Sequence, residues 1–150
     1  AYRLRTMYGE IICDGNHSTY AALNNFFMSK GPDYSIMISD ALMAKGTPVG
    51  SKHIFGGNEI VIYPDGSAHL TSTGGLAGST LNINKGLRIL VEKALIPFNY
   101  AINACTINPA RCLGVDDRKG SLQVGKDADI VVLNDDYSVV QTYCKGKAQL

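Results

Sequence analysis

The chain has 150 residues, of which 45% are hydrophobic and 18% are charged, and its formal net charge is +1. This composition excludes a disordered chain and is sufficient for a folded domain with a sizeable core. Charges or glycines interrupt every apolar run, and no basic cluster stands out, so we expect neither a membrane nor a nucleic acid as a partner.

The cysteine pattern points to reduced thiols. Cys13, Cys105, Cys112 and Cys144 show no Cys-x-x-Cys spacing, and each lies among apolar neighbours, where free cysteine behaves as a small core residue. We therefore expect a cytoplasmic protein. The N-terminus has no initiator Met and no apolar signal-peptide core, which fits a trimmed or internal start.

The first part of the chain predicts two buried strands joined by a helix. Residues 1–8 read as the end of a helix or its exit loop. The apolar run Glu10–Cys13 then ends in a turn, and a second run, Tyr34–Ser39, arrives at Asp40. Ser18 or Thr19 can cap the helix between them. Strand, helix and strand form a βαβ unit, which needs neighbouring strands to complete a parallel sheet.

The character of the sequence changes after Pro48. His53–Leu70 has turn signals on both sides of the β-branched run Glu59–Tyr63, and this pattern predicts an antiparallel ribbon. Helical sequence then returns, and Ser79 or Thr80 can cap the next helix. The apolar stripe of that helix is Leu87, Leu90, Val91 and Ala94.

Two shorter helices and a hairpin close the chain. Pro97 suits the first turn of one helix, and Pro109 begins a final turn that Gly114 ends. The runs Ile130–Leu133 and Ser138–Cys144 are separated by a turn and predict paired strands.

Polar side chains follow the two strands of the predicted parallel pair. In a (β/α) barrel, groups at the carboxyl ends of the strands face the active site. Asp40 at such a position can act as a general base, and His17 can bind a substrate oxygen or polarise a carbonyl. The alternatives are that Asp40 caps the next segment or orders its own loop, and that His17 is a solvated loop residue.

The remaining candidates carry weaker signals. Gly74–Thr80 is rich in glycine and precedes a helix, so it is either a ligand-binding loop or a plain capped loop. Asp127 and Asp129 open an apolar strand, and we expect them to hold a turn. His53 and His69 lie in the predicted ribbon without the spacing of a metal site.

Five sequence elements together resemble the N-acetylglucosamine-6-phosphate deacetylase family of the amidohydrolase superfamily, over nearly the whole chain. The last two are shared by many amidohydrolases, whereas the first and third, at this order and distance, favour the sugar deacetylases. The elements are Asp14-Gly15-Asn16-His17, Ser39-Asp40-Ala41, Leu76-Ala77-Gly78-Ser79, Asn108-Pro109-Ala110-Arg111 and Gly125-Lys126-Asp127-Ala128-Asp129.

The resemblance implies roles for particular residues. Asp40 corresponds to the catalytic acid/base, His17 to a substrate-binding histidine, and Leu76, Ala77 and Gly78 to a loop whose backbone contacts the sugar. The implied reaction is hydrolysis of N-acetylglucosamine 6-phosphate, a small sugar phosphate, to glucosamine 6-phosphate and acetate. The family uses a divalent metal, zinc or similar, whose ligands this chain lacks. A homodimer is also implied.

The implied fold class is α/β: the last strands and helices of a (β/α)8 amidohydrolase barrel plus part of a small β-sandwich domain. Residues 1–50 are assigned to the barrel, 51–72 to a β-ribbon of the sandwich, 73–118 to helices on the barrel and 119–150 to returning sandwich strands. We expect a C-terminal fragment of a longer enzyme, which is inactive alone.

Two alternatives stay open. One is another metal-dependent amidohydrolase, dihydroorotase-like or nucleobase-deaminase-like, because these enzymes share the last two elements. The other is a non-catalytic β-sandwich or sugar-binding module.

Overall fold

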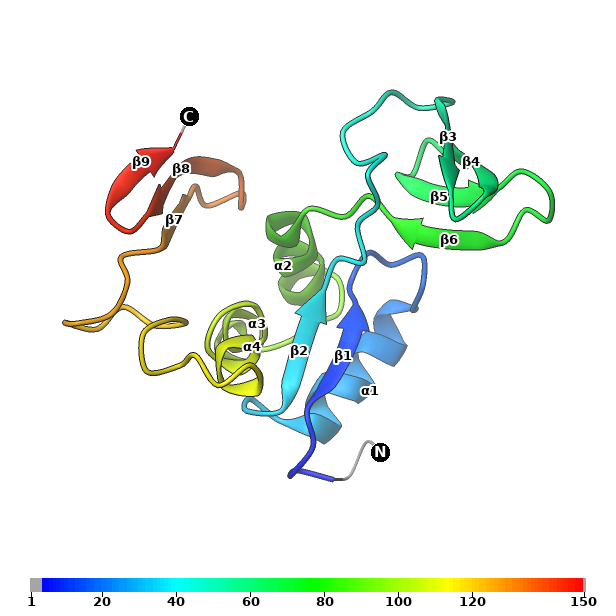
Figure 1. Ribbon diagram of the computed structural model, residues 1–150. Coiled ribbons are helices and arrows are strands. Elements are labelled where there is room, and N and C mark those ends of the chain that lie inside the picture. The colour runs from blue at the N-terminus through cyan, green and yellow to red at the C-terminus, as the bar shows by residue number, and fades with distance from the viewer. Residues whose placement is uncertain (1–3, 150) are drawn as a thin grey trace.

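The computed structural model describes residues 4–149, and within them it shows a mixed α/β fold with three separate sheets (Figure 1). The helices are α1 (Tyr20–Lys30), α2 (Ile83–Glu92), α3 (Phe98–Cys105) and α4 (Ile107–Cys112). The strands are β1 (Gly9–Ile12), β2 (Ser35–Ile38), β3 (Lys52–Phe55), β4 (Asn58–Ile62), β5 (Ser67–Leu70), β6 (Leu76–Ser79), β7 (Ile130–Leu133), β8 (Val139–Cys144) and β9 (Lys147–Gln149).

The predicted βαβ unit is confirmed. Strands β1 and β2 pair in parallel, with Ile12 opposite Ile38, and α1 connects them. The Thr19 hydroxyl caps α1 by accepting a hydrogen bond from the Ala22 N–H at 3.2 Å. Of the residues before β1, 5–7 form a turn, whereas 1–3 lie outside the described part of the chain.

The core lies between this unit and the later helices. Helix α1 buries Leu23, Phe26 and Phe27 on one face, and these side chains form a cluster with Leu87 and Leu90 of α2. Burying a side chain of this size contributes about 1.5–3 kcal/mol, so this cluster is the largest source of stability that we identify. Strand β2 contacts all four helices and is covered by them (Figure 1).

Two contacts bring the later helices close to β2. A side chain at Gly86 of α2 would lie 2.6 Å from the Met37 sulfur, so Met37 would have to shift to accommodate any larger residue there. The fully buried Asn108 of α4 donates from Nδ2 to the carbonyl oxygens of Pro32 and Ser35, at 2.8 and 2.9 Å. The Asn-Pro-Ala-Arg element therefore fixes α4 to the start of β2.

The middle sheet is larger than the predicted ribbon. It has the order β3-β4-β5-β6, so it continues beyond residue 72 to Ser79. The prediction that Gly74–Thr80 is a loop directly capping a helix is wrong, since Leu76–Ser79 is a strand paired with β5. Asn82, rather than Ser79 or Thr80, is the N-cap residue of α2.

The last sheet confirms the predicted closing strands and extends them. Strands β7, β8 and β9 are antiparallel neighbours in that order. Figure 1 shows this sheet and the β3–β6 sheet well apart, on either side of α2. Within residues 4–149 none of the helices is long and apolar enough to cross a bilayer.

The cysteines are only partly as predicted. All four are free, and burial raises the pKa of Cys13 and raises that of Cys105 to about 12. Cys112 and Cys144 are exposed, so the prediction that each cysteine is a core residue is wrong for these two. Apolar neighbours in the sequence did not indicate burial of these two cysteines. Cys112 ends α4 next to the exposed Leu113, and Cys144 lies in the last sheet, which leaves many apolar side chains exposed.

The core cluster predicts a contrast between two leucines. Leu90 is fully buried and Leu113 is 76% exposed. Leu90→Ala should lower the free energy of unfolding by about 3 kcal/mol, and Leu113→Ala by less than about 0.5 kcal/mol. Urea unfolding followed by circular dichroism measures both values. Equal losses for the two variants would contradict the proposed core.

Candidate active site

Three segments far apart in sequence meet at the carboxyl end of the parallel strands. Ile12 and Ile38 are the last paired residues of β1 and β2, so Asp14 and Asp40 both follow at the same sheet edge. Strand β6 joins this edge through a parallel bridge between Ala41 and Ser79. The structure therefore gathers the predicted site segments, which carry His17, Asp40 and Leu76–Gly78, from three strands.

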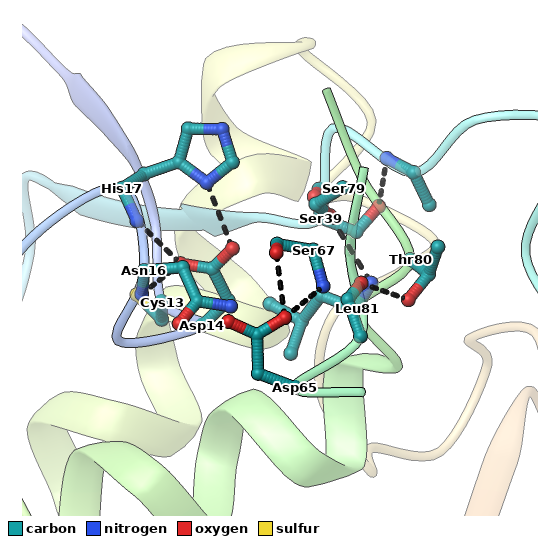
Figure 2. A network of polar contacts seen from close by, with 12 residues as sticks. Cys13, Asp14, Asn16, His17, Ser39, Asp65, Ser67, Ser79, Thr80 and Leu81 are labelled. Carbon is teal, nitrogen blue, oxygen red and sulfur yellow. Dashed lines mark hydrogen bonds and ion pairs between the residues drawn. The ribbon is translucent and has the colours of Figure 1, made fainter. Parts of the chain in front are cut away.

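The turn after β1 is ordered by Asp14. Its Oδ1 accepts hydrogen bonds from the backbone N–H groups of Asn16 and His17, at 2.9 and 3.0 Å, and its Oδ2 lies 2.8 Å from His17 Nδ1 (Figure 2). An aspartate that bonds the backbone two and three residues ahead is typical of a tight turn. This turn fixes both the backbone and the ring of His17.

Electrostatics at this turn favour an ionised Asp14. Burial of the carboxyl group opposes ionisation, but the hydrogen bonds from His17 and Asn16 outweigh burial and hold the pKa of Asp14 below its usual range. An ionised carboxylate only accepts, so His17 Nδ1 carries the hydrogen between them. Nε2 is then the ring nitrogen left for a ligand. It accepts a hydrogen bond when the ring is neutral and donates one when the ring is charged.

Asp40 has a different environment from Asp14. Its side chain is exposed, and within residues 4–149 its carboxylate has no hydrogen-bond or ion-pair partner. The interpretation that Asp40 orders its own loop would require such bonds. Its backbone lies in the left-handed region with φ +47°, which costs a non-glycine residue about 1–3 kcal/mol. Strain of this kind clusters at functional sites.

Strand β6 passes directly beside Asp40. A side chain at Gly78 would lie 2.7 Å from the Leu42 side chain and 3.2 Å from the Asp40 carbonyl oxygen, so the close approach requires glycine. Strand β6 is also the edge strand of its sheet. One row of its backbone groups therefore faces away from β5 and is available to a ligand at Leu76–Gly78.

Residues beneath β6 hold it in place. The Ser67 hydroxyl lies 2.6 Å from Asp65 Oδ1 and 2.8 Å from His69 Nε2 (Figure 2 shows the first contact). His69 stacks on Tyr63 with ring centroids 4.0 Å apart, and its Nδ1 lies 2.7 Å from the Gly74 carbonyl oxygen. His69 thus fixes the segment that leads into Leu76, and its role is structural.

The other predicted residues lie away from this edge or serve the fold. His53 Nε2 lies 3.1 Å from the hydroxyls of Thr47 and Ser51. The prediction that Asp127 and Asp129 hold a turn is confirmed. Lys119 bridges both carboxylates and lowers the pKa of each, and Asp129 also accepts the Lys145 N–H at 2.8 Å.

Sequence reasoning missed two residues at the site. Asp14 was part of a quoted motif but had no assigned role, although an aspartate three residues before a histidine is a turn signal. Ser79 was expected to cap a helix, and its real partners are the residues after β2. No local pattern indicates that pairing.

The residues of this edge do not make a metal site on their own. Within the described part of the chain, no group of three or more His, Cys, Asp or Glu side chains could hold a metal ion. Asp14 and the Nδ1 of His17 are committed to each other. Only His17 Nε2 and the Asp40 carboxylate remain free, so a divalent metal would need ligands from elsewhere.

The chain is similar to known proteins over nearly all of its length. A family model described as the amidohydrolase family matches residues 37–148. The N-acetylglucosamine-6-phosphate deacetylase of Bacillus subtilis is 40% identical over 137 residues, which are 91% of this chain and 34% of that protein. A putative N-acetylgalactosamine-6-phosphate deacetylase of Escherichia coli K12 is 36% identical over 138 residues, 92% of this chain and 80% of that protein.

Solved structures agree with the sequence comparison. The deacetylase of Pasteurella multocida superposes with a TM-score of 0.88 at 27% identity, over 95% of this chain and 36% of that one. A complex of the Mycobacterium smegmatis deacetylase with N-acetyl-D-glucosamine-6-phosphate gives 0.90 at 28% identity, over 98% of this chain and 39% of that one. The chain thus spans about a third of the length of the Bacillus subtilis relative.

The Asp14–His17 contact predicts a pH-dependent loss of stability. Asp14→Asn removes a charged acceptor from a partly buried turn and should cost about 1–2 kcal/mol at pH 7. The pKa of Asp14 is near 3.9 in the unfolded chain and lower in the folded chain, so its stabilisation is complete above about pH 4 and is lost as the pH falls through the folded value.

Urea unfolding of both proteins between pH 7 and pH 2 tests this expectation. The difference in the free energy of unfolding between the native protein and Asp14→Asn should disappear below about pH 4. Asp135→Asn, at an exposed aspartate of the last sheet's turn, is the matched control and should show no such difference. A difference for Asp14→Asn that stays constant down to pH 2 would contradict the assignment.

Proposed function

Since the chain belongs to the amidohydrolase family, we propose that it supplies the acid/base and part of the substrate site of an enzyme that hydrolyses N-acetylglucosamine 6-phosphate to glucosamine 6-phosphate and acetate. The observation that carries this proposal is the free Asp40 carboxylate at the carboxyl end of β2, at the same end of the sheet as His17 in the turn after β1 and next to the glycine-containing edge strand β6.

Asp40 is suited to move a proton during amide hydrolysis. Its carboxylate accepts a proton from the attacking water as the water oxygen bonds to the acetyl carbon. The same group then returns that proton to the amide nitrogen as the carbon–nitrogen bond breaks, and a well-placed group of this kind contributes about 10²- to 10⁴-fold to the rate. A carboxylate already committed to a partner, such as Asp14, could not do this.

His17 and β6 are suited to hold the substrate. Because Asp14 occupies Nδ1, His17 presents Nε2 to a sugar or carbonyl oxygen in one fixed ring orientation. The outward row of backbone groups at Leu76, Ala77 and Gly78 supplies donors and acceptors for hydroxyl groups. Fixed polar groups around one reactive centre are what substrate positioning requires.

A divalent metal, zinc or similar, belongs to the proposed reaction, where it would supply Lewis-acid chemistry. The described residues do not provide a ligand set for it, so its ligands would come from outside this part of the chain. The family resemblance also favours a homodimer, and the four free thiols support a cytoplasmic location.

The proposed architecture is the end of a (β/α)8 barrel with part of a small β-sandwich domain. The parallel pair β1–β2 and its surrounding helices support the barrel assignment for 1–50 and 83–112. The sequence assigned residues 51–72 and 119–150 to one sandwich. The contact of β6 with Asp40–Leu42 instead favours the β3–β6 sheet as an addition at the barrel rim, which leaves β7–β9 for the sandwich.

The reaction can be tested in a chimera that carries this chain in place of the matching third of the Bacillus subtilis deacetylase. Acetate release from N-acetylglucosamine 6-phosphate should fall at least about 100-fold with Asp40→Asn, because the acid/base is lost. Asp33→Asn is the matched control, since Asp33 lies exposed near the amino end of β2 and pairs only with Arg111. The chain alone serves as the baseline and should release no acetate.

Full activity of Asp40→Asn in a chimera with unchanged metal content would rule out Asp40 as the acid/base. Loss of activity in both Asp33→Asn and Asp40→Asn would point to misfolding instead of chemistry.

A second substrate is favoured by the Escherichia coli relatives, two of which are named as N-acetylgalactosamine-6-phosphate deacetylases at 36% identity. The two sugar phosphates are epimers and share the acetamide and the phosphate. Because a single hydroxyl contact changes binding by roughly 1–3 kcal/mol, the preferred epimer should have a kcat/KM at least about fivefold higher in the chimera. Equal kcat/KM values for the two substrates would indicate that residues of this chain do not distinguish the orientation of the hydroxyl at which the epimers differ.

A further inference from the structure

Ser79 contacts the residues that follow β2 at three points. Its hydroxyl donates to the Ser39 carbonyl oxygen, and its N–H donates to the Asp40 carbonyl oxygen at 2.8 Å. Its own carbonyl oxygen accepts the Leu42 N–H at 2.8 Å. Ser79 is 1% exposed, so these bonds are shielded from water.

The Ser79 hydroxyl is buried and has no hydrogen left to donate to a substrate. Its single hydrogen goes to Ser39, and its oxygen accepts the Leu81 N–H at 3.1 Å (Figure 2). The hydroxyl is therefore a structural connection between β6 and the end of β2.

These bonds act on the two peptide groups that flank Asp40. The peptide before Asp40 carries the Ser39 oxygen, and the peptide after it carries the Asp40 oxygen. The angles φ and ψ of a residue describe how its two flanking peptide planes are turned about Cα. Because one buried residue holds both planes, it sets the backbone conformation of Asp40.

The direction of the Asp40 carboxylate depends on that conformation. The side chain has no partner of its own within residues 4–149, and φ is +47°, a conformation that aspartate tolerates better than most residues but that is still unfavourable for it. We propose that Ser79 is the positioning residue of Asp40, holding its backbone in the left-handed conformation that presents the carboxylate. The proposal rests on the role of Asp40 as the acid/base.

Strand β6 is itself anchored on the side away from Asp40. The Thr80 hydroxyl donates to the Gly66 carbonyl oxygen at 2.5 Å, which ties the strand to the turn between β4 and β5. This hydrogen bond stabilises the same β3–β6 sheet, but the three hydrogen bonds to residues 39–42 described above are made by Ser79 and not by Thr80. Thr80→Val is therefore a matched control for Ser79→Ala.

A pair of substitutions at position 40 measures how strongly the fold requires a positive φ at this residue. Asp40→Gly and Asp40→Ala both remove the carboxylate, but only glycine adopts a positive φ without strain. While the restraint is present, Asp40→Gly should have an unfolding equilibrium constant about fivefold lower than Asp40→Ala. Ser79→Ala removes the side-chain bond to the Ser39 oxygen, which holds the peptide before Asp40, and leaves the two backbone bonds in place. Combined with Ser79→Ala the preference should fall to about twofold or less, and combined with Thr80→Val it should stay near fivefold. Urea unfolding of the chain gives all six values.

The Asp40 Cα and Cβ chemical shifts give a second, spectroscopic measurement. They should report a left-handed backbone in the native chain, move in Ser79→Ala and stay unchanged in Thr80→Val. If Ser79→Ala does not fold, Ser79→Cys replaces it, because a thiol keeps the size but donates only weakly. A glycine preference and Asp40 shifts that do not respond to either change at Ser79 would overturn the proposal.

Failure of this proposal is distinguishable from failure of the proposed function. Neither measurement uses catalysis, so an uncoupled Ser79 would leave the role of Asp40 untouched. Conversely, if acetate release survives Asp40→Asn, Asp40 is not the acid/base, but Ser79 can still be shown to set the backbone conformation at position 40.

Discussion

The hydrogen bonds between Ser79 and the residues after β2 join parts of the chain that are about forty positions apart. Local sequence makes the βαβ unit and, separately, the antiparallel sheet β3–β6. This connection, together with the packing of Leu42 and Ala44 against the β3–β6 sheet, places the edge of that sheet against the carboxyl end of the parallel strands. The left-handed backbone of Asp40, the close approach at Gly78 and the position of the substrate-facing edge at Leu76–Gly78 all depend on it.

Two aspartates at the same edge have contrasting environments, and the contrast gives them different roles. Asp14 is enclosed by hydrogen bonds that keep it ionised, so it serves as a fixed acceptor that orients His17. Asp40 is exposed and unpaired within the described residues, so it can exchange a proton with a substrate or water. The proposed amide hydrolysis needs one mobile proton and one rigidly held binding group, and we assign the first to Asp40 and the second to His17.

The sequence was sufficient for the elements whose signals are local. The Ser18 or Thr19 cap and the apolar runs of β1 and β2 predicted the βαβ unit, and parallel pairing then implied that Asp40 and His17 share an edge. Strand β6 was missed because Leu76-Ala77-Gly78-Ser79 has little strand propensity, and it is a strand only through pairing with β5 and with the end of β2. The exposure of Cys112, at the end of α4, and of Cys144, at the end of β8, likewise depends on what packs over each element, which neighbouring residues do not encode.

The central claim is that the carboxyl end of β1 and β2 is where the acetamide of the sugar phosphate is hydrolysed. A crystal structure of the chimera with Asp40→Asn and bound N-acetylglucosamine 6-phosphate tests it most directly. The account predicts the acetamide nitrogen within about 3 Å, or one water molecule, of the side chain at position 40, with a substrate oxygen at His17 Nε2. A substrate bound with its acetamide away from both residues would contradict it.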